Sequence, residues 1–114
     1  MKNLEQIRAF NAINAPGRYA GANDGEVVKK IPALIRENGL LGAAAFALEK
    51  KGGYQQAFGA IIAHLADPQI GKLQSVVQLD DFIRIVSSSD SSLLRGITSE
   101  SLSYLNYLCR FARE

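Results

Sequence analysis

Residues 30–40 read Lys-Ile-Pro-Ala-Leu-Ile-Arg-Glu-Asn-Gly-Leu, and this stretch decides how the chain folds. Its apolar residues recur at the spacing of an amphipathic helix, and Pro32 stands inside that helix. We expect the helix to begin near Asp24, which is a good N-cap, and to kink at Pro32. Gly39 stands where a left-handed residue commonly ends a helix. The stretch therefore predicts a kinked helix with a defined start and a defined end.

Helical spacing recurs outside this stretch, whereas strand-like alternation over more than four residues is rare. Further helices are expected over about 40–51, ended by Gly52-Gly53, and over about 54–65, ended before Pro68. A first helix, marked by Leu4, Ile7, Phe10 and Ile13, is expected to end at Pro16-Gly17, followed by an irregular connection over residues 14–25. Residues 69–79 fit either the start of a fifth helix or a packed loop. The pattern predicts an all-α fold, a compact bundle of about five or six helices.

The last helix is expected to start near Asp90, after the cap-like run Ser87-Ser88-Ser89, and to continue as one helix. Its second half reads Thr98-Ser-Glu-Ser-Leu-Ser-Tyr-Leu-Asn-Tyr-Leu-Cys-Arg-Phe-Ala112. The core of the bundle is expected to include the apolar residues that share the inward helix faces: Val28, Ile31, Leu34, Phe46, Phe58, Ile61, Ile62, Leu65, Phe82, Leu94, Ile97, Leu105 and Leu108.

Composition fits one soluble domain over residues 1–114, since 47% of the residues are hydrophobic and 21% are charged. Cys109 is the single cysteine, so no internal disulfide can form, and a cytoplasmic location is expected. The N-terminal residues show no apolar signal core, and the longest nearly apolar run, residues 40–48, is too short to span a bilayer. No membrane partner is therefore expected. The net charge of +2 does not by itself indicate nucleic-acid binding.

Residues capable of chemistry do not form a catalytic pattern. His64 is the only histidine, and Asp67 is its only nearby partner in sequence, so a half-buried or capping histidine is expected. Cys109 falls beside the apolar stripe of the last helix and is expected to be an unreactive thiol, although Arg110 could lower its pKa. Asp80 and Asp81 fit a helix N-terminus. We therefore expect no catalytic residue, metal, cofactor or small-molecule substrate, and we expect His64→Ala and Cys109→Ser to leave function intact.

Basic residues gather in three places and are the candidates for nucleic-acid contact. The candidates are Lys29, Lys30 and Arg36, opposite Val27, Ile31 and Leu34; Lys50 and Lys51, at the end of the next helix; and Arg95, Arg110 and Arg113, in a stripe with Ser99, Ser103 and Asn106. We expect no compensating acid near Lys29 and Lys30 or near Arg110 and Arg113. Such faces are either solvated surface or weak contacts to RNA phosphates. No aromatic platform of the kind that reads RNA bases is present in the sequence pattern.

Four motifs in this order resemble the small subunit of the type III-B CRISPR effector, the RNA-targeting Cmr complex. They are Ile31-Pro-Ala-Leu-Ile35, Asn38-Gly39-Leu40, Ser88-Ser89-Asp90, and Leu102-Ser-Tyr-Leu-Asn-Tyr-Leu-Cys-Arg-Phe-Ala112. Tyr107 stands where many members carry a tryptophan, and residues 14–25 look shorter and less charged than in the family. The small subunit of the type III-A complex is a related alternative.

The resemblance implies a helical subunit without nuclease activity that serves antiviral defence. Several copies are expected to stack beside the backbone subunits and to help form a basic channel for guide and target RNA. The implied partners are other subunits of the Cmr complex, further copies of the chain, and CRISPR RNA and target RNA through weak backbone contacts. No RNA-contacting residue is carried over by motif. A helical adaptor or scaffold with protein partners only is the alternative from a different class.

Overall fold

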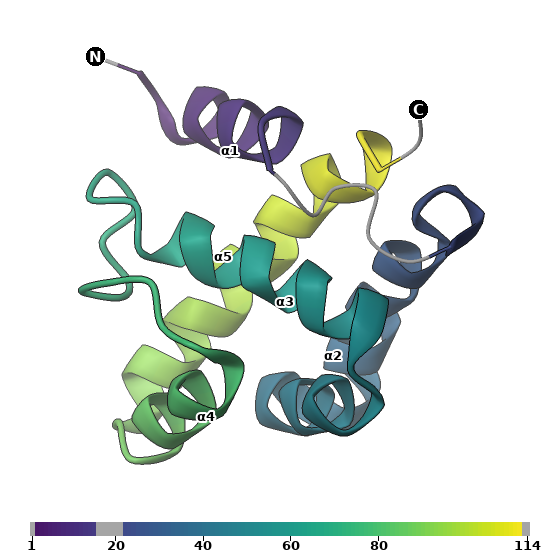
Figure 1. Ribbon diagram of the computed structural model, residues 1–114. Helices are drawn as coiled ribbons and strands as arrows, with labels where there is room; N and C mark the ends of the chain where they lie inside the picture. The colour runs from purple at the N-terminus through teal and green to yellow at the C-terminus, as the bar shows by residue number, and fades with distance from the viewer. Residues whose placement is uncertain (1, 16–21, 113–114) are drawn as a thin grey trace.

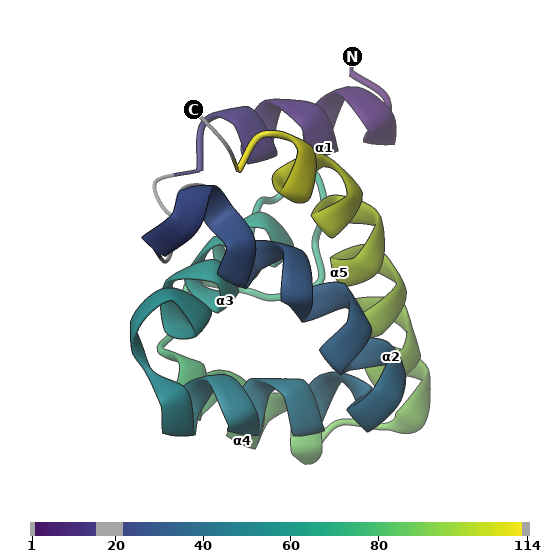
Figure 2. The same ribbon diagram turned by 90° about the vertical axis from the view of Figure 1, so that its right-hand side faces the viewer.

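The computed structural model describes residues 2–15 and 22–112. It contains α1 (Leu4–Ile13), α2 (Ala22–Lys50), α3 (Gly52–Leu65), α4 (Leu79–Ser87) and α5 (Ser91–Arg110), and no strand in the residues described. This confirms the predicted all-α fold and the number of helices. α3 and α5 cross in the centre, α2 packs on both of them and on α4, and α1 lies across α5 and α3 (Figures 1 and 2).

α1 begins with a capping box that closes its first turn. The Asn3 side chain accepts a hydrogen bond from the Gln6 backbone N–H at 2.9 Å, and the Gln6 side chain accepts one from the Asn3 backbone N–H at 2.9 Å. The helix ends at Asn14, close to the predicted end, while Pro16 and Gly17 lie outside the described residues.

α2 already begins at Ala22, so the predicted irregular connection over residues 14–25 extends too far.

α2 corrects the prediction that one helix ends at Gly39 and another begins at residue 40. Gly39 does adopt the predicted left-handed backbone, with φ of +80°, yet helical hydrogen bonding continues to Lys50. The ribbon of α2 changes direction sharply partway along its length (Figure 2). The left-handed glycine therefore turns the helix instead of ending it, because the chain can resume helical geometry directly afterwards. Pro32 lies inside the helix, as predicted, and a kink at that residue stays a prediction.

The junction between α2 and α3 consists of a single residue, Lys51. Its φ of 62° and ψ of −158° lie in a region that side chains other than glycine rarely occupy. Gly52, with φ of 56°, already belongs to α3. The predicted helix end near residue 51 is therefore correct, but Gly52 and Gly53 begin the next helix, whose predicted start is about residue 54. Their small size lets α3 start immediately after the turn.

The segment between α3 and α4 is a packed loop, which settles the alternative left open for residues 69–79. The backbone N–H groups of Lys72 and Leu73 both donate to the Leu65 carbonyl, at 3.1 and 3.0 Å, which folds the loop against the end of α3. α4 then begins at Leu79. Asp90 caps α5 as predicted, because its side chain accepts from the Leu93 N–H at 2.8 Å, and α5 continues unbroken to Arg110.

The buried core lies mainly among α2, α3, α4 and α5, with Ala12 of α1 and Ala15 joining it, and most of the predicted core residues are in it. Leu34, Phe46 and Leu94 are only half-buried. The largest deviation is in α1, where Leu4, Phe10 and Ile13 are 48%, 54% and 42% exposed. α1 therefore buries little apolar surface, and polar contacts have a larger part in holding it to the other helices.

Residues 26–50 of α2 are long and apolar enough to cross a membrane by length and composition alone. The core helix of a soluble protein passes the same test. In this structure the helix packs against α3, α4 and α5, and its outward face carries Lys29, Lys30 and Arg36. We therefore interpret α2 as a packing helix of the bundle.

Candidate functional site

All of the predicted basic residues that the structure describes are exposed. They are Lys29, Lys30, Arg36, Lys50, Lys51, Arg95 and Arg110, whereas Arg113 lies outside the described residues. None of the seven forms an ion pair with another described residue. The Lys50 ammonium lies 5.7 Å from the centre of the Phe46 ring, which is a cation–π distance. These positive charges are therefore available to a polyanion.

One residue of the predicted α2 group, Lys29, lies near the C-terminal end of α5. The Cys109 thiol lies 3.6 Å from the Val28 carbonyl, so the first turns of α2 adjoin the C-terminal end of α5 (Figures 1 and 2). Lys29 is close enough to Cys109 to act on its thiol electrostatically. Lys29 therefore lies near the end of α5 that carries Arg110. Arg95 stands at the other end of α5, about 22 Å away at a rise of about 1.5 Å per residue.

The two helices differ in how their basic residues are compensated. Glu26 and Glu37 are exposed on the same outward face of α2 as Lys30, which corrects the prediction that no acid stands near this group. On α5, the only acidic residue is Glu100, and it is buried on the inward side. The outward face of α5 therefore carries Arg95 and Arg110 without an acid, and it is the more purely basic of the two.

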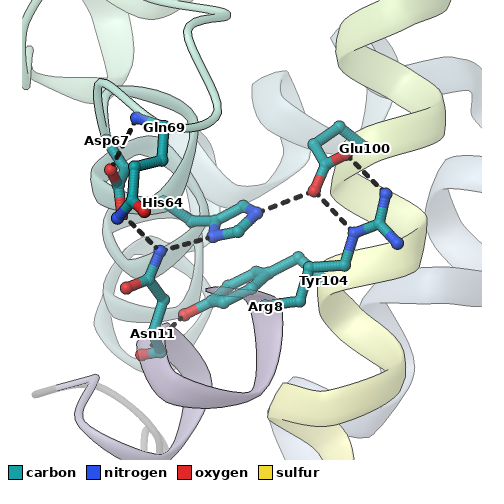
Figure 3. A network of polar contacts seen from close by, with 7 residues as sticks. All are labelled: Arg8, Asn11, His64, Asp67, Gln69, Glu100 and Tyr104. Carbon is teal, nitrogen blue, oxygen red and sulfur yellow. Dashed lines mark hydrogen bonds and ion pairs between the residues drawn. The ribbon is translucent and has the colours of Figure 1, made fainter. Parts of the chain in front are cut away.

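A buried polar cluster, here called the His64 centre, joins three helices. It consists of Arg8, Asn11, His64, Asp67, Glu100 and Tyr104 (Figure 3). The Glu100 carboxylate accepts hydrogen bonds from Arg8 Nε at 2.9 Å and Arg8 Nη2 at 2.8 Å. His64 Nε2 lies 2.8 Å from the same carboxylate, and the His64 ring stacks on Tyr104 with their centres 4.1 Å apart. The centre therefore ties α1 and α3 to α5.

Asn11 completes the centre on the opposite side of the imidazole. Its Nδ2 lies 2.9 Å from His64 Nδ1 and donates to Asp67 Oδ2 at 2.9 Å (Figure 3). Its backbone carbonyl lies 3.5 Å from the Tyr104 hydroxyl, a contact at the long limit of a hydrogen bond. Asn11 thus connects α1 to the end of α3 and to α5.

The environment of the centre shifts the pKa values of its members. Burial lowers the pKa of His64, and this outweighs the opposing hydrogen bond to Glu100. Burial opposes ionisation of Glu100, but hydrogen bonds from Arg8 and His64 together hold its pKa below the usual range. The hydrogen bond from Asn11 lowers the pKa of Asp67. Burial raises the pKa of Tyr104. The centre therefore holds neutral His64 beside ionised Glu100 and Asp67.

The sequence analysis identified His64 but not its surroundings. His64 is 1% exposed, so the predicted half-buried or capping role is wrong, and Asp67 reaches it only through Asn11. The direct partner is Glu100, which stands on the inward face of α5 beside Ser101. The sequence signal that could have revealed Glu100 is an acid next to the apolar stripe of a helix, because a charge on such a face needs a buried partner.

The other predicted candidates, Cys109, Asp80 and Asp81, lie in environments close to the predicted ones. Burial raises the pKa of Cys109, and Lys29 opposes this rise more weakly, so Arg110 does not activate the thiol. Asp80 and Asp81 lie exposed in the first turn of α4 and pair with Arg84 at 3.7 and 2.8 Å. No group of three or more His, Cys, Asp or Glu residues suited to a metal ion occurs within residues 2–15 and 22–112.

The fold and the site define a small all-helical domain with exposed cations and an internal polar centre. Residues 4–114 match the family model described as CRISPR-associated protein (Cas_Cmr5). The chain belongs to this family, the small subunit of the type III-B Cmr complex. The resemblance found in the sequence is thereby confirmed. Comparison with curated proteins and with solved structures gave no match.

Proposed function

We propose that this chain is a non-catalytic small subunit whose copies stack within the Cmr complex and help to hold guide and target RNA. The observation that carries the proposal is the acid-free outward face of α5, with Arg95 and Arg110, which Lys29 of α2 adjoins at one end. Exposed cations without ion-pair partners suit contacts to phosphates, which carry no sequence information. Because Cys109 is a free thiol, the proposed location is the cytoplasm, where thiols stay reduced.

Weak binding by each copy is part of the proposal. A net charge of +2 and widely spaced cations allow one copy to contact few phosphates. Copies aligned along one RNA would add their contacts at high effective concentration. The subunit would therefore bind RNA usefully only inside the assembled complex.

Charge-neutralising variants of the assembled complex test this proposal. Arg95→Gln/Arg110→Gln/Arg113→Gln and Lys29→Gln/Lys30→Gln/Arg36→Gln should each weaken target-RNA binding and flatten its salt dependence. We expect the larger loss from the α5 set, because acids partly compensate the α2 set. A variant with Glu37→Gln and Glu49→Gln is the opposite-charge control, since it removes two exposed acids of α2 and should not weaken RNA binding. If both basic variants assemble and bind RNA as the native complex does, the proposal fails.

Lack of catalysis is proposed from the chemistry of the two nucleophile or base candidates. Both ring nitrogens of His64 already contact protein groups inside the bundle, and the Cys109 thiol is held in its protonated form. Highly purified protein should leave RNA intact in the presence of Mg²⁺ or Mn²⁺. Cleavage that co-purifies with the chain and disappears in His64→Gln would overturn this. His64→Ala is less suitable, because it also removes a partner of Glu100.

An adaptor with protein partners only is the second candidate. The observation that favours it is the exposure of Leu4, Phe10 and Ile13 on α1, and of Val76 and Ile85 elsewhere. Under this reading the basic variants would bind RNA normally, whereas polar replacements of the α1 residues would prevent assembly. The same set of complexes therefore separates the two functions.

A further inference from the structure

The hydrogen bonds around His64 determine which of its nitrogens carries the proton. Asn11 Nδ2 has two hydrogens and no acceptor lone pair, and it faces both His64 Nδ1 and the Asp67 carboxylate. A flipped Asn11 amide would bring its oxygen against Asp67 Oδ2, placing two acceptors together. Nδ1 must therefore accept a hydrogen bond and carry no proton. The single proton of the ring lies on Nε2, which donates to Glu100.

A second proton on the ring has no acceptor in this arrangement. An N–H at Nδ1 would point at the Asn11 amino group, and turning Asn11 to accept it would break the hydrogen bond to Asp67. The ring is 1% exposed and stacked on Tyr104, so it cannot reach water by a small rotation. Its charged neighbours are Arg8 on α1, Asp67 after α3, and Glu100 on α5, while Tyr104 is neutral. Arg8 already neutralises Glu100, so an imidazolium gains less from that carboxylate.

α1 is held to the bundle by a few buried apolar side chains and by the polar links of the His64 centre. Within α1, Ile7 and Ala12 are buried, whereas Leu4, Phe10 and Ile13 are largely exposed. Its polar links run from Arg8 to Glu100 and from Asn11 to His64 and Asp67. Ala12 is the one residue of α1 in the hydrophobic core cluster, so most of that cluster would stay packed if α1 moved away. Local opening of α1 would therefore disrupt mainly these polar links and the burial of Ile7 and Ala12.

We propose that the His64 centre is a proton-sensitive latch. α1 stays docked on α3 and α5 while His64 carries one proton on Nε2, and it undocks when the ring takes up a second proton at Nδ1. A released ring would titrate near its ordinary value of about 6.5. Below that pH, each further unit raises the undocked population about tenfold until the docked ring itself begins to bind protons. This latch is independent of RNA binding and would stand if the proposed function failed.

The chain offers a direct test because His64 is its only histidine. Protein made without a histidine tag gives one pair of imidazole ¹⁵N signals, and at pH 7.5 these should show the Nε2–H tautomer. Hydrogen exchange is then measured from pH 7.5 to 5.0 and corrected for the intrinsic pH dependence of exchange. Amides of α1 should lose protection in step with His64 protonation, while amides of α3 and α5 stay protected. Above pH 5 both Glu100 and Asp67 remain ionised, because their pKa values are lowered.

Two variants separate the latch from general acid instability. In His64→Gln the side chain is neutral at every pH, so protection of α1 should not change between pH 7.5 and 5.0. In Asp67→Asn, Asn11 can turn to accept from a protonated ring, so release should shift to lower pH; this variant also serves if His64→Gln does not fold. An Nδ1–H tautomer, protection of α1 that persists while His64 titrates, or unchanged acid release in the variants would each overturn the proposal.

Discussion

At the residue scale, Glu100 decides how three helices meet. It belongs to α5 and accepts hydrogen bonds from Arg8 on α1 and from His64 on α3. Two of these bonds form a bidentate arginine–carboxylate pair, the strongest common geometry for such ions. Because Glu100 is 7% exposed, loss of its charge leaves buried donors without an acceptor. A single side chain thus links the packing of α1 to that of the core.

Glu100→Gln should lower the free energy of unfolding by about 1.5–3 kcal/mol, the range for hydrogen bonds to a charged group. Glutamine keeps the size of the side chain but offers Arg8 one acceptor oxygen instead of two. Urea denaturation of the variant and the native protein at pH 7.5 measures the difference. Glu37→Gln is the matched control, because Glu37 is exposed and its change should stay within about 0.5 kcal/mol. Equal effects of the two substitutions would contradict the role given to Glu100.

Single residues of the His64 centre also determine how the stability of the protein changes at low pH. The pKa of folded His64 is lowered, so below about pH 6.5 the unfolded chain binds a proton that the folded chain does not. Stability should therefore fall as the pH drops from 7 to 5.5. The lowered pKa values of Glu100 and Asp67 add a further loss below about pH 4.5. Urea midpoints that stay constant or rise between pH 7 and 5.5 would contradict this sign.

At the scale of the elements, α2 shows where sequence patterns stop being decisive. Its buried stripe and its left-handed Gly39 were both predicted, and both are present. The sequence pattern could not predict that α2 continues past Gly39. A left-handed glycine is compatible both with the end of a helix and with a change of direction inside one. α2 packs against α3 and α4, and the Phe46 ring beyond Gly39 meets the Tyr54 ring of α3 edge to face with centres 5.2 Å apart. Such packing favours continuation of the helix after the turn.

Two glycine substitutions test this account of α2. Gly39→Ala forces a Cβ into the left-handed region and should cost about 1–2 kcal/mol, although no atom lies within 4 Å of the new carbon. Gly59 is helical in α3 and also has open space around its Cβ position. Gly59→Ala should therefore stabilise the protein, by roughly 0.5–1 kcal/mol. Thermal denaturation measures whether each substitution raises or lowers the stability of the protein. A neutral or stabilising Gly39→Ala would contradict a left-handed backbone at Gly39.

α1 shows the other limit of prediction from sequence. Its periodic Leu4, Ile7, Phe10 and Ile13 predicted the helix correctly, yet most of these side chains are exposed. Apolar periodicity identifies a helix face but not what covers it. The polar contacts that dock α1 join residues about 50 to 90 positions apart, such as Arg8 with Glu100. Such pairs leave no local pattern, so the His64 centre could be found only in the folded chain.

At the scale of the whole molecule, family membership and the exposed cations both support the proposed function. The fold class, the last helix and the family were predictable, because periodicity, caps and ordered motifs are local features of the sequence. The position of Lys29 near the C-terminal end of α5 was not, because it depends on how α2 crosses α5. Under the proposed function, such a surface would give each copy few phosphate contacts, so RNA binding would depend on the assembly of several copies.

The salt dependence of target-RNA affinity tests this central claim most directly. Affinity is measured over a range of salt concentrations for the isolated chain and for Cmr complexes assembled with and without it. The isolated chain should bind weakly with a shallow slope. The complex that contains the chain should show a steeper slope than the complex that lacks it, by about 0.7 for each added phosphate contact to single-stranded RNA. Identical affinities and slopes for the two complexes would contradict the claim that this subunit helps to hold RNA.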